Sequence, residues 1–151
     1  MIYLAVDHRV FALIEKLKEY LSGQNYEVED LGAFQLDTND DYVDFAIAAS
    51  EKISRDPAGA RGIFICGSGV GMDVVANKFK GVHAALCADK EAAMQSREHG
   101  NANVLVLATD NTSVEKTKEI VDAWLKTPFT GEERHVRRLK KIEEIEEKNF
   151  K

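Results

Sequence analysis

A glycine-rich loop directly follows an apolar run in the middle of the chain. Residues 62–66, GIFIC, are typical of a strand buried on both faces of a parallel sheet, and residues 67–71, GSGVG, come next. Because glycines leave the backbone open, the amides of this loop can turn inward at a helix start and bind a phosphate or an oxyanion. The residues expected to do so are Gly67, Gly69, Val70 and Gly71, with the Ser68 hydroxyl beside them. The alternative is a tight turn that serves only helix packing. A dinucleotide site is disfavoured, because it needs a third glycine where Met72 stands.

Cys66 stands where this strand delivers its last side chain to the loop. A free thiol has a pKa of about 8.5, and the partial positive charge of a helix start together with unpaired amides favours the thiolate. We therefore expect Cys66 to act as a base or a nucleophile. Cys87 has no glycine loop after it and is expected to be a small buried hydrophobic residue. A disulfide between the two cysteines is not expected.

Polar residues also follow the first strand and precede the fifth. Ligands of open parallel sheets bind beyond the carboxyl ends of the strands, where Asp7 and His8 follow the first strand. We expect His99 to converge with His8 and Asp7 on one rim, although a lone histidine is more often a surface residue. No metal is expected, since no histidine or cysteine pair has zinc-ligand spacing.

Arg134 and Arg138 lie four residues apart and would share one face of the last helix. Two guanidinium groups on one face suit a phosphate. Surface ion pairing with Glu132 or Glu133 is the alternative.

The composition describes an ordinary globular chain. It has 151 residues, 44% of them hydrophobic, and a formal net charge of −6, so attraction to nucleic acid or to an anionic membrane is not expected. The first residues have no basic region and no long apolar stretch, which predicts a cytoplasmic protein without a signal peptide.

Short apolar runs alternate with segments of helical period. Strands are expected over residues 2–6, 28–31, 62–66, 82–88 and 103–107, and helices over 10–21, 42–53, 72–79, 90–99, 114–125 and from about 134 to the end. This order predicts a single α/β domain over residues 1–151, a Rossmann-like three-layer α/β/α sandwich with a five-stranded parallel sheet. The last helix, about 134–148, has only a narrow apolar stripe of Leu139, Ile142 and Ile145, which favours packing on a partner subunit over a solvated surface helix.

Taken together, these residues resemble the ribose-5-phosphate isomerase type B and galactose-6-phosphate isomerase family over nearly the whole chain. The motifs that carry the resemblance are Asp7-His8, residues 66–72 with Ala76-Asn77-Lys78, residues 84–87, 96–99 and 102–105, and Arg134-His135 with Arg138.

The resemblance implies a cofactor-free aldose–ketose isomerase of sugar phosphates, with ribose 5-phosphate and ribulose 5-phosphate as the first pair. Cys66 would move a proton through a cis-enediolate, His99 would assist ring opening, and Asp7 would lie near the substrate hydroxyls. His8, Arg134 and Arg138 would bind the phosphate. Family members place the site at a dimer interface, so a homodimer or homotetramer is expected.

Several positions depart from the family pattern. Gly100 stands where an asparagine is usual, Asp110 where an arginine is common, and His83 where an arginine is frequent. Arg9 is a hypothetical replacement for the missing positive charge. Two alternatives therefore stay open: an isomerase of another sugar phosphate (tetrose, allose or galactose 6-phosphate), and a catalytically silent sugar-phosphate-binding subunit.

Overall fold

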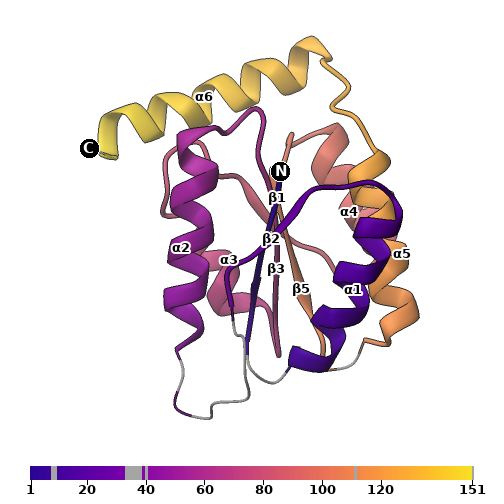
Figure 1. Ribbon diagram of the computed structural model, residues 1–151. Coiled ribbons are helices and arrows are strands. Elements are labelled where there is room, and N and C mark those ends of the chain that lie inside the picture. Colours follow the sequence, from indigo (N-terminus) through magenta and orange to yellow (C-terminus); the bar gives the residue numbers. More distant parts are fainter. Residues whose placement is uncertain (8–9, 33–38, 40, 111, 151) are drawn as a thin grey trace.

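The computed structural model describes residues 1–7, 10–32, 39, 41–110 and 112–150, in which strands and helices alternate (Figure 1). The strands are β1 (Ile2–Val6), β2 (Val28–Asp30), β3 (Arg61–Cys66), β4 (Ala84–Leu86) and β5 (Val104–Ala108). The helices are α1 (Phe11–Gly23), α2 (Tyr42–Arg55), α3 (Val70–Ala76), α4 (Lys90–Glu98), α5 (Val114–Lys126) and α6 (Glu133–Asn149). No helix in these ranges is both long enough and apolar enough to cross a bilayer.

The strands form one parallel sheet in the order β2-β1-β3-β5-β4. This confirms the predicted five-stranded parallel sheet. The strand order reverses between β1 and β3, and sheets of this kind bind ligands beyond the carboxyl ends of the strands at such a point. β5 lies between β3 and β4, so β4 is an edge strand.

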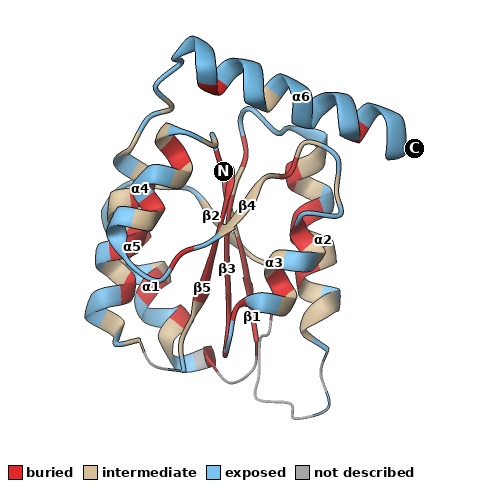
Figure 2. Cartoon of the chain, turned by 180° about the vertical axis from the view of Figure 1, so that it is seen from behind, coloured by how far each residue is buried: buried red, intermediate tan, exposed pale blue. Residues whose placement is uncertain are grey.

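Helices cover both faces of the sheet, which confirms the three-layer sandwich (Figure 2). Side chains alternate along the strands: Leu4 and Val6 of β1 pack in one core, and Ala5 packs in the other. The first core is closed by α1, α4 and α5, where Trp124 is the largest fully buried side chain. The second core is closed by α2 and α3.

Helix α3 differs most from its expected range of 72–79. It begins at Val70 because Gly69, with a φ of 79°, takes the left-handed conformation at the N-cap. It ends at Ala76 because the Asn77 side chain bonds to the backbone of Ala84, donating to its carbonyl at 3.1 Å and accepting from its amide at 2.9 Å. These bonds join the end of α3 to the start of β4.

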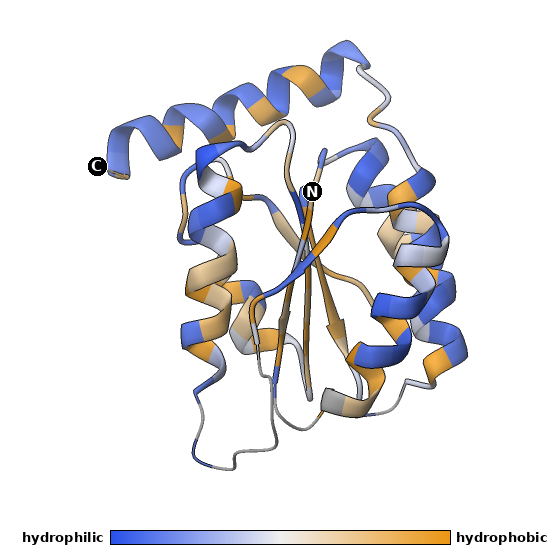
Figure 3. Ribbon diagram, viewed as in Figure 1, coloured by the Kyte–Doolittle hydropathy of each residue, from blue (hydrophilic) through white to orange (hydrophobic). Residues whose placement is uncertain are grey.

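Helix α6 lies across the amino ends of the strands (Figure 1) and is largely hydrophilic (Figure 3). Within it only His135 and Glu146 are buried. Its apolar residues Val136, Ile142 and Ile145 are 47%, 43% and 59% exposed. Packing of this helix on a partner subunit stays a prediction.

Candidate active site

Asp7 and Cys66 lie side by side at the carboxyl edge of the sheet. Val6 pairs with Ile65, and the Asp7 amide donates a hydrogen bond to the Ile65 carbonyl at 2.9 Å. Asp7 is 6% exposed and Cys66 is 5% exposed. The two strands on either side of the sheet's switch point therefore end side by side, which brings Asp7 and Cys66 to the carboxyl edge where the sequence analysis expected each of them.

The glycine loop bends back over the Cys66 sulfur. The Gly69 amide donates to Cys66 Sγ at 3.1 Å. Gly69 cannot be replaced without cost, since its φ is positive and a Cβ atom would lie 2.5 Å from Leu86 Cδ1. A backbone N–H donor at this distance stabilises negative charge on sulfur, which is what a thiolate base requires.

The end of β5 holds the other side of the loop. The amides of Thr109 and Asp110 donate to the Gly67 carbonyl at 3.1 and 3.2 Å, and the Thr109 amide also lies 3.1 Å from the Cys66 carbonyl oxygen. Ser68 is exposed, and its hydroxyl accepts from the Val70 amide at 3.4 Å. The loop is thus held by hydrogen bonds to β3 and to the end of β5, while Ser68 and Val70 are exposed to solvent.

Tyr42 is a candidate site residue that the sequence reasoning missed. It is the first residue of α2, and a Cβ atom added to Gly71 would lie 2.2 Å from its hydroxyl oxygen. Helix α2 follows a strand, so its first turn must lie at the carboxyl edge of the sheet, and this rule could have identified Tyr42. Gly71 is therefore required for the close approach of a phenol to the loop.

His99, Arg134 and Arg138 lie at the opposite edge of the sheet. His99 is the C-cap of α4, which runs antiparallel to the strands, so it lies near the amino ends together with α6 (Figure 1). The six residues of β3 span roughly 20 Å at about 3.3 Å per residue. The expectation that His99 joins Asp7 on one rim is therefore wrong within a single chain. His8 and Arg9 lie outside the described residues.

A turn between α4 and β5, held by the buried Arg97 side chain, positions His99 at the amino edge of the sheet. Arg97, 6% exposed, donates to the carbonyls of Ala102 and Thr127 and to Asn101 Oδ1. Burial lowers the pKa of the Arg97 guanidinium to about 10. His99 is exposed above this turn and stacks on His135 of α6, with ring centroids 4.3 Å apart. Arg134 pairs with Glu132 at 3.1 Å, so the alternative of surface ion pairing is met for this arginine in the isolated chain.

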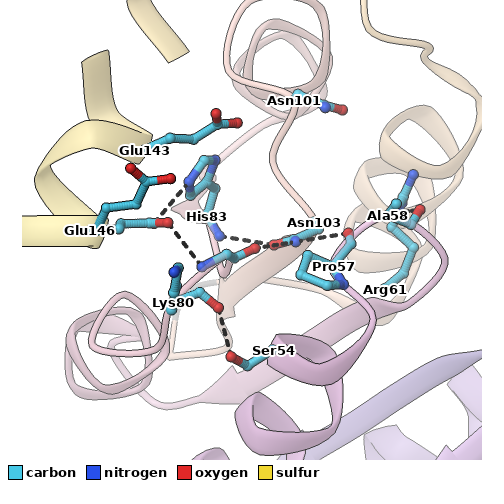
Figure 4. Close-up of a pocket in the computed structure, with 12 residues that line it drawn as sticks. Ser54, Pro57, Ala58, Arg61, Lys80, His83, Asn101, Asn103, Glu143 and Glu146 are labelled. Carbon is cyan, nitrogen blue, oxygen red and sulfur yellow. Dashed lines mark hydrogen bonds and ion pairs between the residues drawn. The ribbon is translucent and has the colours of Figure 1, made fainter. Parts of the chain in front are cut away.

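A cavity of about 540 Å³ lies under α6, also at the amino edge (Figure 4). Buried Glu146 of α6 accepts from the Gly81 amide at 3.0 Å and lies 3.1 Å from His83 Nε2. Asn103 bridges the carbonyls of Pro57 and Gly81. His83, at a position where an arginine is frequent in the family, therefore helps to hold α6 in place and lies at the opposite edge of the sheet from the Cys66 loop.

Cys87 lies where the sequence reasoning placed it. Cys87 is 3% exposed within the first core, and burial raises the pKa of its thiol, which confirms its role as a packed hydrophobic residue. Cys66 and Cys87 are not joined by a disulfide. Over the described ranges, no three His, Cys, Asp or Glu side chains are grouped so as to hold a metal ion.

Comparisons with known proteins agree with this geometry. The Ribose/Galactose Isomerase family matches residues 2–142. The chain is 42% identical over 141 residues to the probable ribose-5-phosphate isomerase B of Mycoplasma genitalium, covering 93% of this chain and 92% of that protein. It is 37% identical over 145 residues to ribose-5-phosphate isomerase B of Mycobacterium tuberculosis, covering 96% and 89%.

Solved structures show the same similarity in three dimensions. The crystal structure of ribose-5-phosphate isomerase B from Mycoplasma genitalium with bound ribulose-5-phosphate superposes with a TM-score of 0.95 at 40% identity, covering 98% of this chain and 97% of that one. Type B ribose 5-phosphate isomerase from Trypanosoma cruzi superposes with a TM-score of 0.91 at 40% identity, covering 98% and 99%. On its sequence and its fold, the chain belongs to the Ribose/Galactose Isomerase family.

Proposed function

We propose that this chain is an aldose–ketose isomerase that interconverts ribose 5-phosphate and ribulose 5-phosphate. The full-length similarity to ribose-5-phosphate isomerases B, one of them with bound ribulose-5-phosphate, supports the substrate pair. The observation that carries the chemistry is the hydrogen bond from the Gly69 amide to Cys66 Sγ. It gives the chain a sulfur base beside further backbone donors.

Cys66 would act on the open-chain sugar. Its thiolate takes the proton from C2 of the aldose, the C–H electron pair forms a C1–C2 double bond, and the carbonyl electrons move to O1, which accepts a proton. The sulfur then returns its proton to C1 while O2 loses its proton and becomes the ketone oxygen. The loop amides and Ser68 would stabilise the oxyanion of this cis-enediolate, and losing one such donor typically costs about 10²–10³ in rate.

The other predicted residues would serve ring opening and binding. His99 would donate a proton to the ring oxygen of the aldose, a contribution of about 10²–10⁴ for a positioned acid. Asp7, next to Cys66, would bind substrate hydroxyls. His8, Arg134 and Arg138 would bind the phosphate, with Arg9 as the added positive charge.

The Cys66 loop and the group formed by His99, Arg134 and Arg138 can meet in one site only if two copies of the chain associate. Cys66 and His99 lie at opposite edges of one sheet, so one copy would supply the Cys66 loop and the other His99 with the α6 arginines. Apolar residues exposed beside the loop support such an interface: Val70, Val74 and Leu86 are 55%, 53% and 40% exposed. A homodimer or a homotetramer meets the requirement, and either would cover the exposed stripe of α6.

Mixing two inactive variants tests this proposal. Cys66→Ala and His99→Ala chains are unfolded together, refolded and assayed with ribose 5-phosphate. Random pairing into twofold dimers should restore about a quarter of wild-type activity, because half of the dimers carry one intact site. Cys66→Ala mixed with the Cys66→Ala/His99→Ala double variant is the control and should stay inactive. Absence of recovery in the first mixture would show that the site is not shared.

A substrate panel separates ribose 5-phosphate from tetrose, allose and galactose 6-phosphates. The departures at Gly100 and Asp110 change side chains that the family resemblance places near the sugar, so the panel is measured as kcat/KM for each compound. Highest kcat/KM for another sugar phosphate would overturn the proposed pair, and no turnover of any would favour a silent binding subunit. Two cysteines that are not joined by a disulfide suit a reducing compartment, and we propose a cytoplasmic location.

A further inference from the structure

Two histidine rings are stacked at the amino edge of the sheet. The rings of His99 and His135 are 4.3 Å apart between centroids, with an interplanar angle of 15°. His135 is 4% exposed, whereas His99 is exposed. The His135 ring is therefore buried, and the His99 ring stacks on it and is exposed to solvent. The Gln95 side-chain amide lies 3.4 Å from His99 Nδ1 and approaches the upper ring at its edge.

The buried ring has the properties of a passive support. His135 Nε2 has no hydrogen-bond partner among the described residues, and its nearest acidic oxygen is Glu132 Oε2 at 4.0 Å. Desolvation lowers the pKa of His135, and His99, Arg134 and Arg138 lower it further against an opposing effect of Glu132. The His135 ring is therefore uncharged at neutral pH.

We propose that His135 is a positioning residue: its buried ring is the platform that sets the orientation of His99 for proton donation to the sugar ring. This inference rests on the proposed function, in which His99 opens the furanose. Stacking fixes the plane of the His99 imidazole, and Gln95 restricts rotation within that plane. Without the platform, His99 would keep its place at the end of α4 but lose a fixed direction for its N–H.

The two directions of the reaction separate ring opening from proton transfer. Ribose 5-phosphate is a furanose that must open before Cys66 can act. Ribulose 5-phosphate is always open-chain, because its C5 oxygen carries the phosphate. Solvent deuterium enters C1 of bound ribulose 5-phosphate through the enediolate alone. A defect limited to ring opening therefore slows ribose turnover and spares this exchange.

His135→Phe and His135→Leu form a matched pair, because both fill the buried slot with hydrocarbon and only phenylalanine keeps a flat ring. His135→Phe should retain ribose 5-phosphate turnover within about threefold, whereas His135→Leu should lose about tenfold or more, within the range of a positioned acid. Both variants should exchange deuterium into ribulose 5-phosphate at nearly the wild-type rate.

Three results would overturn the platform role. These are full ribose turnover in His135→Leu, a loss in His135→Phe as large as in His135→Leu, or an equal loss of both turnover and exchange in a folded His135→Leu protein. If His135→Leu does not fold, His135→Phe alone decides, since a tenfold loss of ribose turnover there contradicts the proposal. Failure of the wild-type protein to exchange deuterium would instead refute the isomerase function itself.

Discussion

The Gly69 amide and the Cys66 sulfur are joined by a 3.1 Å hydrogen bond across one turn of the glycine loop. The donor belongs to a residue whose backbone is left-handed, and the acceptor is the last side chain of the central strand β3. The left-handed turn and the Cys66 thiol are thus parts of one local structure. A substitution at Gly69 should therefore also change the reactivity of Cys66.

Replacing Cys66 by alanine should abolish deuterium exchange into ribulose 5-phosphate, because the proton acceptor is removed. Cys87→Ala is the matched control and should keep exchange within about threefold, since it alters packing only. Iodoacetamide should inactivate the protein in step with labelling of Cys66, and a sugar phosphate should protect it. Labelling confined to Cys87, whose pKa is raised by burial, would contradict the assignment of the base.

Gly69→Ala should destabilise the protein and reduce turnover together. The positive φ costs about 1–2 kcal/mol for a residue with a Cβ atom. The added Cβ atom would also lie 2.5 Å from Leu86 Cδ1, so the exposed Leu86 side chain must turn away from the loop. Gly131→Ala is the control, since Gly131 also has a positive φ, +71°, but nothing lies within 4 Å of an added Cβ atom. Urea unfolding should show a smaller loss at Gly131, and only Gly69→Ala should lose exchange; similar activity in the two variants would contradict the role of the turn.

Glu146→Ala should loosen α6 from the amino edge of the sheet. It leaves the partly buried Gly81 amide without its acceptor, which costs up to the roughly 1–3 kcal/mol of a fully buried donor. Glu147→Ala removes an exposed carboxylate from the next position and should change the free energy of unfolding by less than about 0.5 kcal/mol. Urea titration of both variants measures the difference. Equal stabilities would show that the Glu146 bonds do not fasten the helix.

Mild acid should destabilise the wild-type protein more than His135→Phe. The pKa of His135 is lowered in the folded state from 6.5, so the unfolded chain binds more protons as the pH falls below that value. The contribution of the neutral His135 to the free energy of unfolding is complete above pH 6.5 and is lost as the pH falls toward its lowered folded-state pKa. The free energy of unfolding, measured at pH 7.5 and at several values below 6.5, should therefore fall less steeply in His135→Phe. Parallel curves would show that this histidine is not held neutral.

The sequence predicted the sheet and the carboxyl-edge half of the candidate site for simple reasons. Continuous apolar runs such as residues 62–66 are expected only where both faces of a strand are covered, and the side chain after such a run lies at the ligand edge. Asp7 and Cys66 could be placed in this way. The same rule would have placed Tyr42 at this edge, but its close approach to Gly71 could not be predicted, because no spacing along the chain records which helix start packs against which loop.

The predicted position of His99 was wrong for a different reason. Its closeness in sequence to β5 was taken as closeness to the ligand edge, although a helix that precedes a parallel strand must end at the amino edge. Helix direction alone would have corrected this. The bonds of Glu146 to Gly81 and His83 were beyond prediction, since they join residues more than 60 positions apart and follow no periodic pattern.

The six-residue length of β3 separates Cys66 from His99, and this has a consequence for how the rate of isomerisation depends on protein concentration. If the reacting sulfur and the proton donor to the sugar ring always come from different molecules, a lone molecule has no working centre for ribose 5-phosphate. Turnover per chain would then fall on dilution and, at very low abundance, total flux would rise with the square of the amount of chain present. A cell could thus silence this step simply by letting the protein become scarce.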